Sequence, residues 1–269
     1  MINTPIATSD PAAGSRSDPA SSLRPVLQLG AIALPVGWLL LSIPLLLDLP
    51  FEPFVLGTLV LGMIVPAVLL TRRESGRAGV KALFRSAVQP PRPRWLLAVA
   101  LLAIPVLSWL VATAVGGAQP LTGSLMATIG VQFATGLLLV NLWEEMVWTG
   151  FAQTRTMRRF GLVKGSLATA ALFAGIHLPL AFADGPSSAP LGILVLFGSS
   201  IFLRLIFGCL YLAGGRGLLA IAVTHAAYNA TGLLIQPGYD LIRLGVIAVL
   251  AAVALLITGR SRRFDTKEI

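Results

Sequence analysis

The stretch LMATIGVQFATGLLLVNLWEEMVWTGFAQ (residues 125–153) predicts the fold of this chain. Its apolar character continues well beyond the roughly 20 residues that a helix needs to cross about 30 Å of hydrocarbon. The same stretch nevertheless carries two adjacent carboxylates, Glu144 and Glu145. An ionisable group at bilayer depth costs roughly 2.5–3.5 kcal/mol even on a lenient insertion scale. The stretch therefore predicts a membrane-spanning helix that holds a buried polar site.

The rest of the chain has the same apolar character. Apolar residues make up 56% of the sequence and charged residues only 12%, a composition that excludes an ordinary soluble domain. The apolar runs lack strand-like alternation, so the sequence predicts an all-α fold, a polytopic transmembrane helical bundle of about eight helices. The predicted spans are 29–49, 54–70, 95–115, 125–153, 166–182, 191–212, 217–235 and 241–258.

Three regions follow from this division of the chain. Residues 1–28 are rich in Ser, Ala, Pro and Asp, and they are predicted to be a disordered cytoplasmic tail. Residues 29–259 form the transmembrane domain, with a motif-bearing core over residues 125–235. Residues 260–269 are predicted to be a basic cytoplasmic tail.

Loop charges predict the orientation. Basic residues concentrate in 72–94, in 155–164 and after the last span, whereas the loops 116–123 and 183–190 contain no Lys or Arg. Because Lys and Arg favour the cytoplasmic side, we expect a multi-pass protein of the plasma (inner) membrane with both termini in the cytoplasm. The net charge of +9 is explained by these flanking residues. Membrane lipids, and not nucleic acid, are therefore the expected partners of the basic residues.

Candidate chemistry lies in three of the predicted spans. Glu144 and Glu145 cannot both ionise cheaply in a low dielectric, so the pair can supply a general base. His177 lies in a second span and His225 in a third. Asn229 shares a helix face with His225 through their i, i+4 spacing, and two donors on one face suit a developing oxyanion.

Depth in the membrane links these groups. At 1.5 Å per residue, Glu144 lies about 14 Å from the predicted cytoplasmic end of its span, His177 about 18 Å and His225 about 12 Å. These depths predict one shared layer and a single polar site. The alternative is that each group only joins helices through hydrogen bonds, as intramembrane polar residues often do. A proton-coupled transporter could also use them as a relay, although the chain shows no internal repeat.

Three short motifs in this order resemble those of a known family. Glu144-Glu145 with Gly150, Phe173 to His177, and His225 to Asn229 are similar to E-E-x-x-x-R-G, F-x-x-x-H and H-x-x-x-N. These are the motifs of the CPBP intramembrane proteases, also called the CAAX-protease and bacteriocin-processing, or Abi, family. The resemblance implies that residues 29–259 are a protease-like domain and that the chain is an intramembrane endopeptidase, a membrane hydrolase of either the glutamate type or the metalloendopeptidase type.

The resemblance also implies a role for each residue. Glu144 and His177 would activate a water, Glu145 would support the site, and His225 with Asn229 would hold the oxyanion. The substrate would be a membrane-associated, prenylated or leader-type peptide that reaches the site from the cytoplasmic side. No cofactor is certain. If a metal takes part, Glu144, His177 and His225 could bind Zn²⁺ and leave one position for water.

One position departs from the family pattern. Thr149 stands where the first motif has Arg, so the fixed positive charge beside the carboxylates is missing there. Arg155 and Arg204 are the candidates to replace that charge. Without a replacement, a catalytically silent membrane scaffold or immunity factor is the alternative function.

Overall fold

The computed structural model describes residues 22–260 and is helical over nearly all of that range. Its order is α1 (Arg24–Leu47), α2 (Glu52–Gly57), η2 (Thr58–Ile64), α3 (Val65–Ala87), α4 (Trp95–Ala114), α5 (Gly123–Thr135), η3 (Gly136–Asn141), α6 (Leu142–Glu145), η4 (Met146–Gln153), α7 (Thr154–His177), η5 (Leu178–Phe182), α8 (Ala189–Ala213), α9 (Leu219–Thr231), η6 (Gly232–Leu234) and α10 (Leu241–Arg260). Within 22–260 the only extended pairing is an isolated bridge between Ala118 and Ile235.

The all-α transmembrane architecture is confirmed, but the helix count is seven and not eight. In the described part of the chain, six continuous helical stretches are long and apolar enough to cross a membrane, and Leu219–Leu234 is a shorter apolar helix. Large apolar side chains such as Leu27, Leu46 and Val249 are more than 60% exposed. That exposure suits contact with lipid and would be a liability in water. The chain is therefore a multi-pass membrane protein.

The difference in count is one of continuous helical stretches and not of passes across the bundle, because one of these stretches reverses its direction at Gly161. The predicted spans 125–153 and 166–182 belong to one uninterrupted stretch, Gly123–Phe182. Gly161 has φ 79°, which lets the chain reverse inside α7 without a separate loop. The two halves then lie side by side, because the hydroxyls of Thr156 and Thr169 are 2.9 Å apart. The chain thus turns at one glycine, whereas the sequence pattern predicts a loop over residues 154–165.

The first helix also begins earlier than predicted. α1 starts at Arg24, with Pro25 in its first turn, where the missing N–H of proline costs nothing. Residues 24–28 of the predicted tail are therefore helical. Residues 1–21 of that tail, and residues 261–269 of the predicted C-terminal tail, lie outside the described part of the chain.

Close packing of α1 on α7 positions the helix that carries His177. Gly30 and Gly37 face α7, and a Cβ at Gly37 would collide with the Ile176 side chain. Trp38 Nε1 donates a 2.6 Å hydrogen bond to the carbonyl oxygen of Gly175. The C-terminal end of α7 is thus fixed against α1 next to the histidine.

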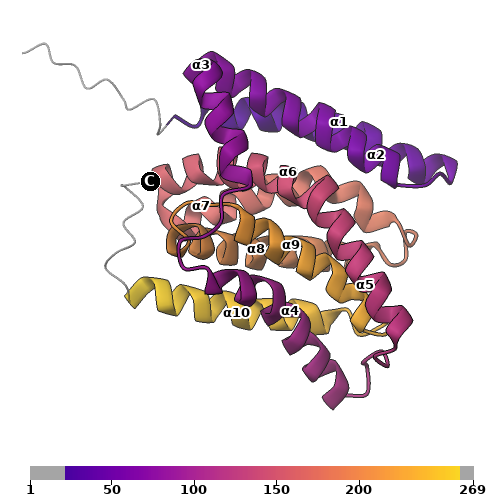
Figure 1. Cartoon of the computed structure of the whole chain (residues 1–269). Coiled ribbons are helices and arrows are strands. Elements are labelled where there is room, and N and C mark those ends of the chain that lie inside the picture. Colours follow the sequence, from indigo (N-terminus) through magenta and orange to yellow (C-terminus); the bar gives the residue numbers. More distant parts are fainter. Residues whose placement is uncertain (1–21, 261–269) are drawn as a thin grey trace, which may run out of the picture.

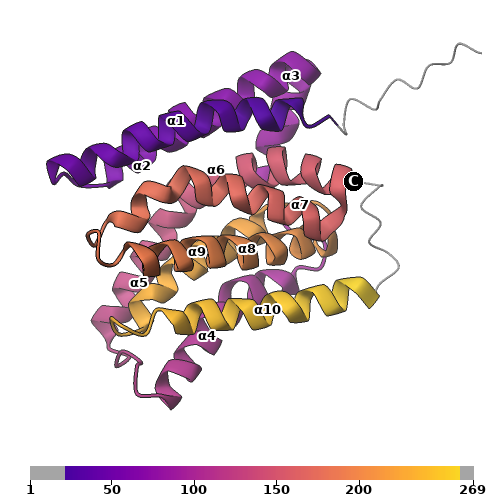
Figure 2. The ribbon, with the colours of Figure 1, turned by 180° about the vertical axis from the view of Figure 1, so that it is seen from behind.

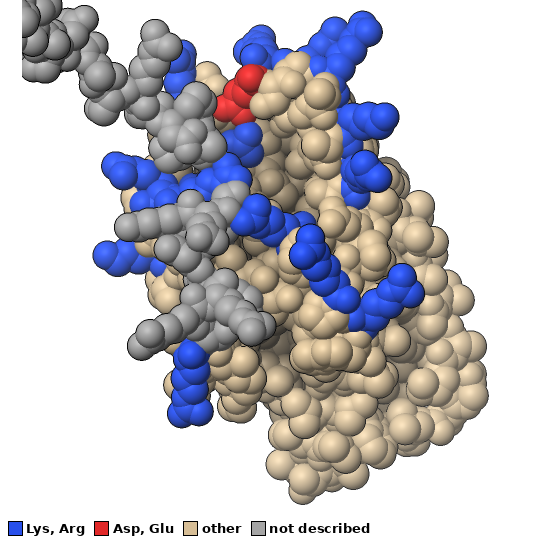
Figure 3. Space-filling model, turned by 60° about the vertical axis from the view of Figure 1, so that its left-hand side comes forward, with Lys and Arg blue, Asp and Glu red and all other residues tan. Residues whose placement is uncertain are grey.

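The helices lie roughly side by side, so the molecule has two distinct ends (Figures 1 and 2). The start of α1, the end of α3, the reversal in α7 and the end of α10 share one of them. Figure 3 shows Lys and Arg side chains gathered at this basic end. At the opposite end are the loops 48–51, 115–122, 183–188 and 235–240, none of which contains Lys or Arg.

Candidate functional site

Both glutamates lie on α6, a single α-helical turn between the π-helical segments η3 and η4. π-Helical turns in α-helices are frequent at functional sites because they re-aim side chains. Glu144 is 5% exposed and Glu145 is fully buried. Neighbouring residues on a helix point about 100° apart, so the two carboxylates enter different surroundings.

Glu145 is held by a complete set of donors. Arg204 Nη2 lies 2.7 Å from its Oε1, and Arg204 Nη1 lies 2.8 Å from its Oε2. Thr149 Oγ1 donates to Oε2 at 2.6 Å, and His225 Nδ1 contacts Oε1 at 2.8 Å. A buried charge is tolerated when it is paired and hydrogen-bonded in this way. Glu145 is therefore a structural anchor behind the site.

Arg204 is fixed as firmly as its partner. It is 1% exposed, and its guanidinium lies 4.6 Å from the ring centre of Phe173 and 5.1 Å from that of Phe207. Gln153 Nε2 donates to the Arg204 carbonyl at 2.7 Å, which ties α8 to η4. Arg155, the other candidate for this charge, lies elsewhere and pairs with Glu74 at 2.7 Å.

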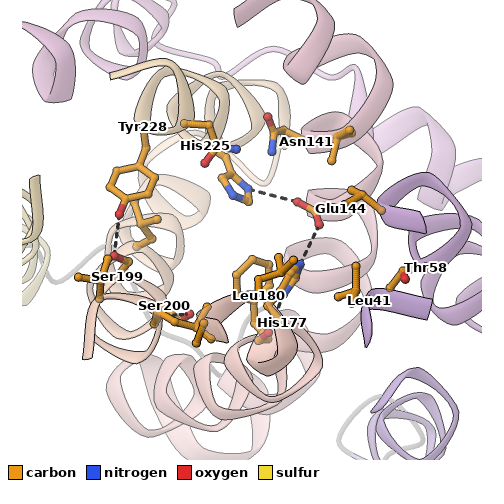
Figure 4. A pocket seen from close by; sticks show the side chains of 18 of the residues that line it. Leu41, Thr58, Asn141, Glu144, His177, Leu180, Ser199, Ser200, His225 and Tyr228 are labelled. Carbon is orange, nitrogen blue, oxygen red and sulfur yellow. Dashed lines mark hydrogen bonds and ion pairs between the residues drawn. The ribbon is translucent and has the colours of Figure 1, made fainter. Parts of the chain in front are cut away.

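Glu144 faces the two histidines (Figure 4). Its Oε1 lies 3.5 Å from His177 Nε2, and its Oε2 lies 3.8 Å from His225 Nδ1. His177 Nδ1 is 2.8 Å from the carbonyl oxygen of Phe173. Because a carbonyl can only accept, Nδ1 carries the hydrogen, and Nε2 is left to face Glu144. The convergence that the predicted depths imply is present.

A cavity of about 400 Å³ opens beside this cluster. Glu144, His177, His225 and Asn229 all line it, and Asn229 is exposed within it. Glu145 is absent from the lining. Of the five residues predicted from the sequence, four thus reach a common cavity, and the fifth lies behind it.

The sequence patterns do not single out some residues that the cavity contains. Asn141 is 1% exposed, lines the cavity and leaves its Oδ1 without a hydrogen-bond partner. Ser199 and Tyr228 line it as well, and their hydroxyls are 2.6 Å apart. Small polar residues in apolar helices are too common to be assigned a site from sequence.

The arrangement limits the metals that could bind. His225 turns Nδ1 toward both carboxylates, and this nitrogen is already engaged by Glu145. Over residues 22–260 there is no group of three or more His, Cys, Asp or Glu side chains placed to hold a metal ion. The side chains of Glu144, His177 and His225 therefore do not fit the three-ligand zinc site.

A buried Glu–His cluster beside a cavity in a transmembrane bundle is the arrangement that the motif resemblance implies. Residues 126–231 match the model of the Rce1-like family, described as type II CAAX prenyl endopeptidase Rce1-like. The matched segment contains the five predicted site residues and Arg204. The match covers less than half of the chain, and it agrees with the resemblance to the CPBP, or CAAX protease, family. Neither the curated proteins nor the solved structures gave a match to the chain.

Proposed function

We propose that this chain is an intramembrane endopeptidase of the glutamate type, with Glu144 as the general base. The observation that carries the proposal is the position of Glu144 between two histidines at a cavity wall, 3.5 Å from His177 Nε2 and 3.8 Å from His225 Nδ1. A general base must lie within hydrogen-bond reach of the proton that it abstracts, directly or through a water. A water held by Glu144 and His177 at the cavity wall meets that condition.

Each group has one part in the reaction. Glu144 takes a proton from the water while the oxygen of the water attacks the peptide carbonyl carbon. The carbonyl oxygen becomes an oxyanion, which receives hydrogen bonds from the Asn229 amide and from Nε2 of His225, when that ring is protonated. Collapse of the tetrahedral intermediate breaks the C–N bond, and Glu144 gives its proton to the leaving amine. The products are a carboxylic acid and an amine, so one water is consumed.

Glu145 and Arg204 position the catalytic groups. Glu145 fixes the His225 ring through Nδ1, and Arg204 balances the charge of Glu145 from α8. Arg204 thereby supplies the positive charge that the family motif places at position 149. Thr149 completes the arrangement, since it accepts from Arg204 Nη1 at 3.1 Å and donates to Glu145. The charge therefore comes from another helix and is not lost.

This relocation weakens the argument for a silent scaffold or immunity factor, which depends on Thr149. A proton-coupled transporter would need a polar path beyond the cluster. Instead, Met146, Val147, Trp148 and Phe151 follow the glutamates toward the basic end, and all are at most 1% exposed. The cavity beside the cluster shares no lining residue with the cavity at the basic end, so residues 22–260 hold no continuous water-sized path across the bundle, and hydrolysis is the function that the arrangement favours.

The cavity walls favour apolar peptide side chains near the scissile bond. Leu41, Val55, Leu180 and Val195 line the cavity beyond the polar cluster. A membrane-associated segment or a prenylated or leader-type peptide has this character. The protein would act within the plasma (inner) membrane, with both termini in the cytoplasm and anionic lipid around the basic end.

A peptide-cleavage assay with purified protein in detergent tests the proposal. Glu144→Gln should lower the cleavage rate at least about 100-fold, because the amide cannot accept the proton. Glu52→Gln is the matched control, since Glu52 is an exposed residue at the start of α2 and does not line the cavity. Equal rates for wild type and Glu144→Gln would refute the role of Glu144.

Treatment with a chelator tests the metal-free scheme. Cleavage should stay within about twofold of the untreated rate, because the three residues do not form a ligand set. Loss of cleavage with chelator, restored by added Zn²⁺, would show that the enzyme is a metalloendopeptidase.

A further inference from the structure

The cavity of Glu144 extends toward only one end of the bundle. Much of the rest of its lining comes from the end of α1, the start of the α2–η2 helix, η5 and the first half of α8. These residues include Leu41, Val55, Thr58, Leu180, Ala181, Gly192, Val195 and Leu196. Their helix ends lead into the loops 48–51 and 183–188, which contain no Lys or Arg. The cavity thus runs from Glu144 toward the end whose loops lack basic residues, where a nearby Arg, Arg243 at the start of α10, is paired with Asp240.

Packed side chains close the other direction. Trp148 and Phe151 lie one and two turns beyond Glu144, and both are buried in one apolar cluster with Leu83 and Ala87 of α3. A separate cavity of about 250 Å³ lies past this core and is lined by polar groups that include Arg155 and Arg216. It shares no lining residue with the cavity of Glu144. The basic end therefore offers no open route to the carboxylate.

We propose that peptides reach Glu144 from the end of the bundle that lacks basic loops. Because Lys and Arg mark the cytoplasmic side, this is entry from the non-cytoplasmic side of the membrane. The direction is opposite to the one expected from the sequence. The substrate is then a peptide segment that is exposed on, or embedded in, the outer half of the bilayer, with apolar side chains next to the scissile bond.

Cysteine accessibility tests the route without depending on cleavage. In a Cys209→Ala background, which removes the single native thiol, Val195→Cys and Val55→Cys place a thiol on two walls of the cavity. Ser75→Cys places one in the separate cavity at the basic end, where Ser75 is exposed. A membrane-impermeant maleimide is added to intact cells and, in parallel, to inverted membrane vesicles.

The expected result is labelling of Val195→Cys and Val55→Cys in intact cells and of Ser75→Cys only in inverted vesicles. Labelling of all three from the same side, or no labelling of the cavity thiols from either side, would overturn the proposed route.

A second measurement connects the route to the proposed function on which it rests. If the chain is a peptidase, labelling of Val195→Cys from outside should reduce cleavage at least about tenfold, because the adduct fills the cavity. If wild type does not cleave peptides at all, the function fails, while the labelling pattern still decides the route. If the labelled protein cleaves at the unlabelled rate, peptides do not use this cavity, and the route fails while the function stands.

Discussion

Arg204 and Glu145 form a two-bond ion pair inside the bundle, with N–O distances of 2.7 and 2.8 Å and at most 1% exposure of either residue. Breaking a buried pair by removing one partner leaves an uncompensated charge, which typically costs about 3–5 kcal/mol. The same pair lies directly behind His225. Its loss should therefore affect both folding and catalysis.

Arg204→Met tests this expectation. The variant should unfold at a clearly lower temperature in detergent, and its surviving folded fraction should cleave peptide at least about tenfold more slowly, because Glu145 no longer holds His225. Arg155→Met is the matched control. Its partner Glu74 is 30% exposed, and a partly exposed pair is worth about 1 kcal/mol or less. Equal effects of the two substitutions would contradict the role of Arg204.

Moving the charge back to the motif position should restore function. Thr149 and Arg204 both hydrogen-bond to the carboxylate of Glu145. Arg204→Ala therefore opens space beside that carboxylate for an arginine introduced by Thr149→Arg. We expect the double variant to recover at least half of the thermal stability lost in Arg204→Ala and to regain measurable cleavage. Thr149→Arg alone should destabilise the protein, because it adds bulk and charge beside Arg204. If the loss of thermal stability in the double variant equals the sum of the losses in the two single variants, Arg204 does not replace the arginine of the family motif.

Asn229→Ala tests the oxyanion site. Removal of one oxyanion donor typically lowers kcat about 100- to 1000-fold. We expect this loss with KM nearly unchanged, because the interaction forms in the transition state. Ser199→Ala, which removes a different polar side chain, a hydroxyl, from the same cavity, should change kcat by less than about threefold. A rise in KM without a loss of kcat would assign Asn229 to substrate binding.

Gly161→Ala tests the reversal in α7. Gly161 has φ 79°, and a residue with a side chain held there is strained by about 1–3 kcal/mol. The variant should therefore have a lower unfolding temperature. Gly130→Ala should leave it unchanged or raise it slightly, because Gly130 is exposed on α5 with open space around its Cα and no positive φ. Unchanged stability of Gly161→Ala would show that the turn adopts another conformation.

Local patterns in the sequence determined which segments are helices and which polar residues they carry. Apolar length predicts a membrane helix because the bilayer fixes its span, and the spacing of His225 and Asn229 places them on one face of α9. An arginine inside the apolar segment 191–212 is itself a signal, since such a charge needs a partner. This signal indicates that Arg204 has a structural or functional role, but the sequence does not show which carboxylate pairs with it.

Only the tertiary structure decided which side chains from these separate segments contact one another. Glu145 meets Arg204 across 59 residues of sequence and His225 across 80, and no local pattern encodes such contacts. They separate two neighbouring glutamates into one that is bound to Arg204 and one that faces the cavity, and packing around Trp148 and Phe151 separates this cavity from the one at the basic end. Periodicity fixes the direction of a side chain within its own helix, whereas its environment depends on which other helices pack against that face.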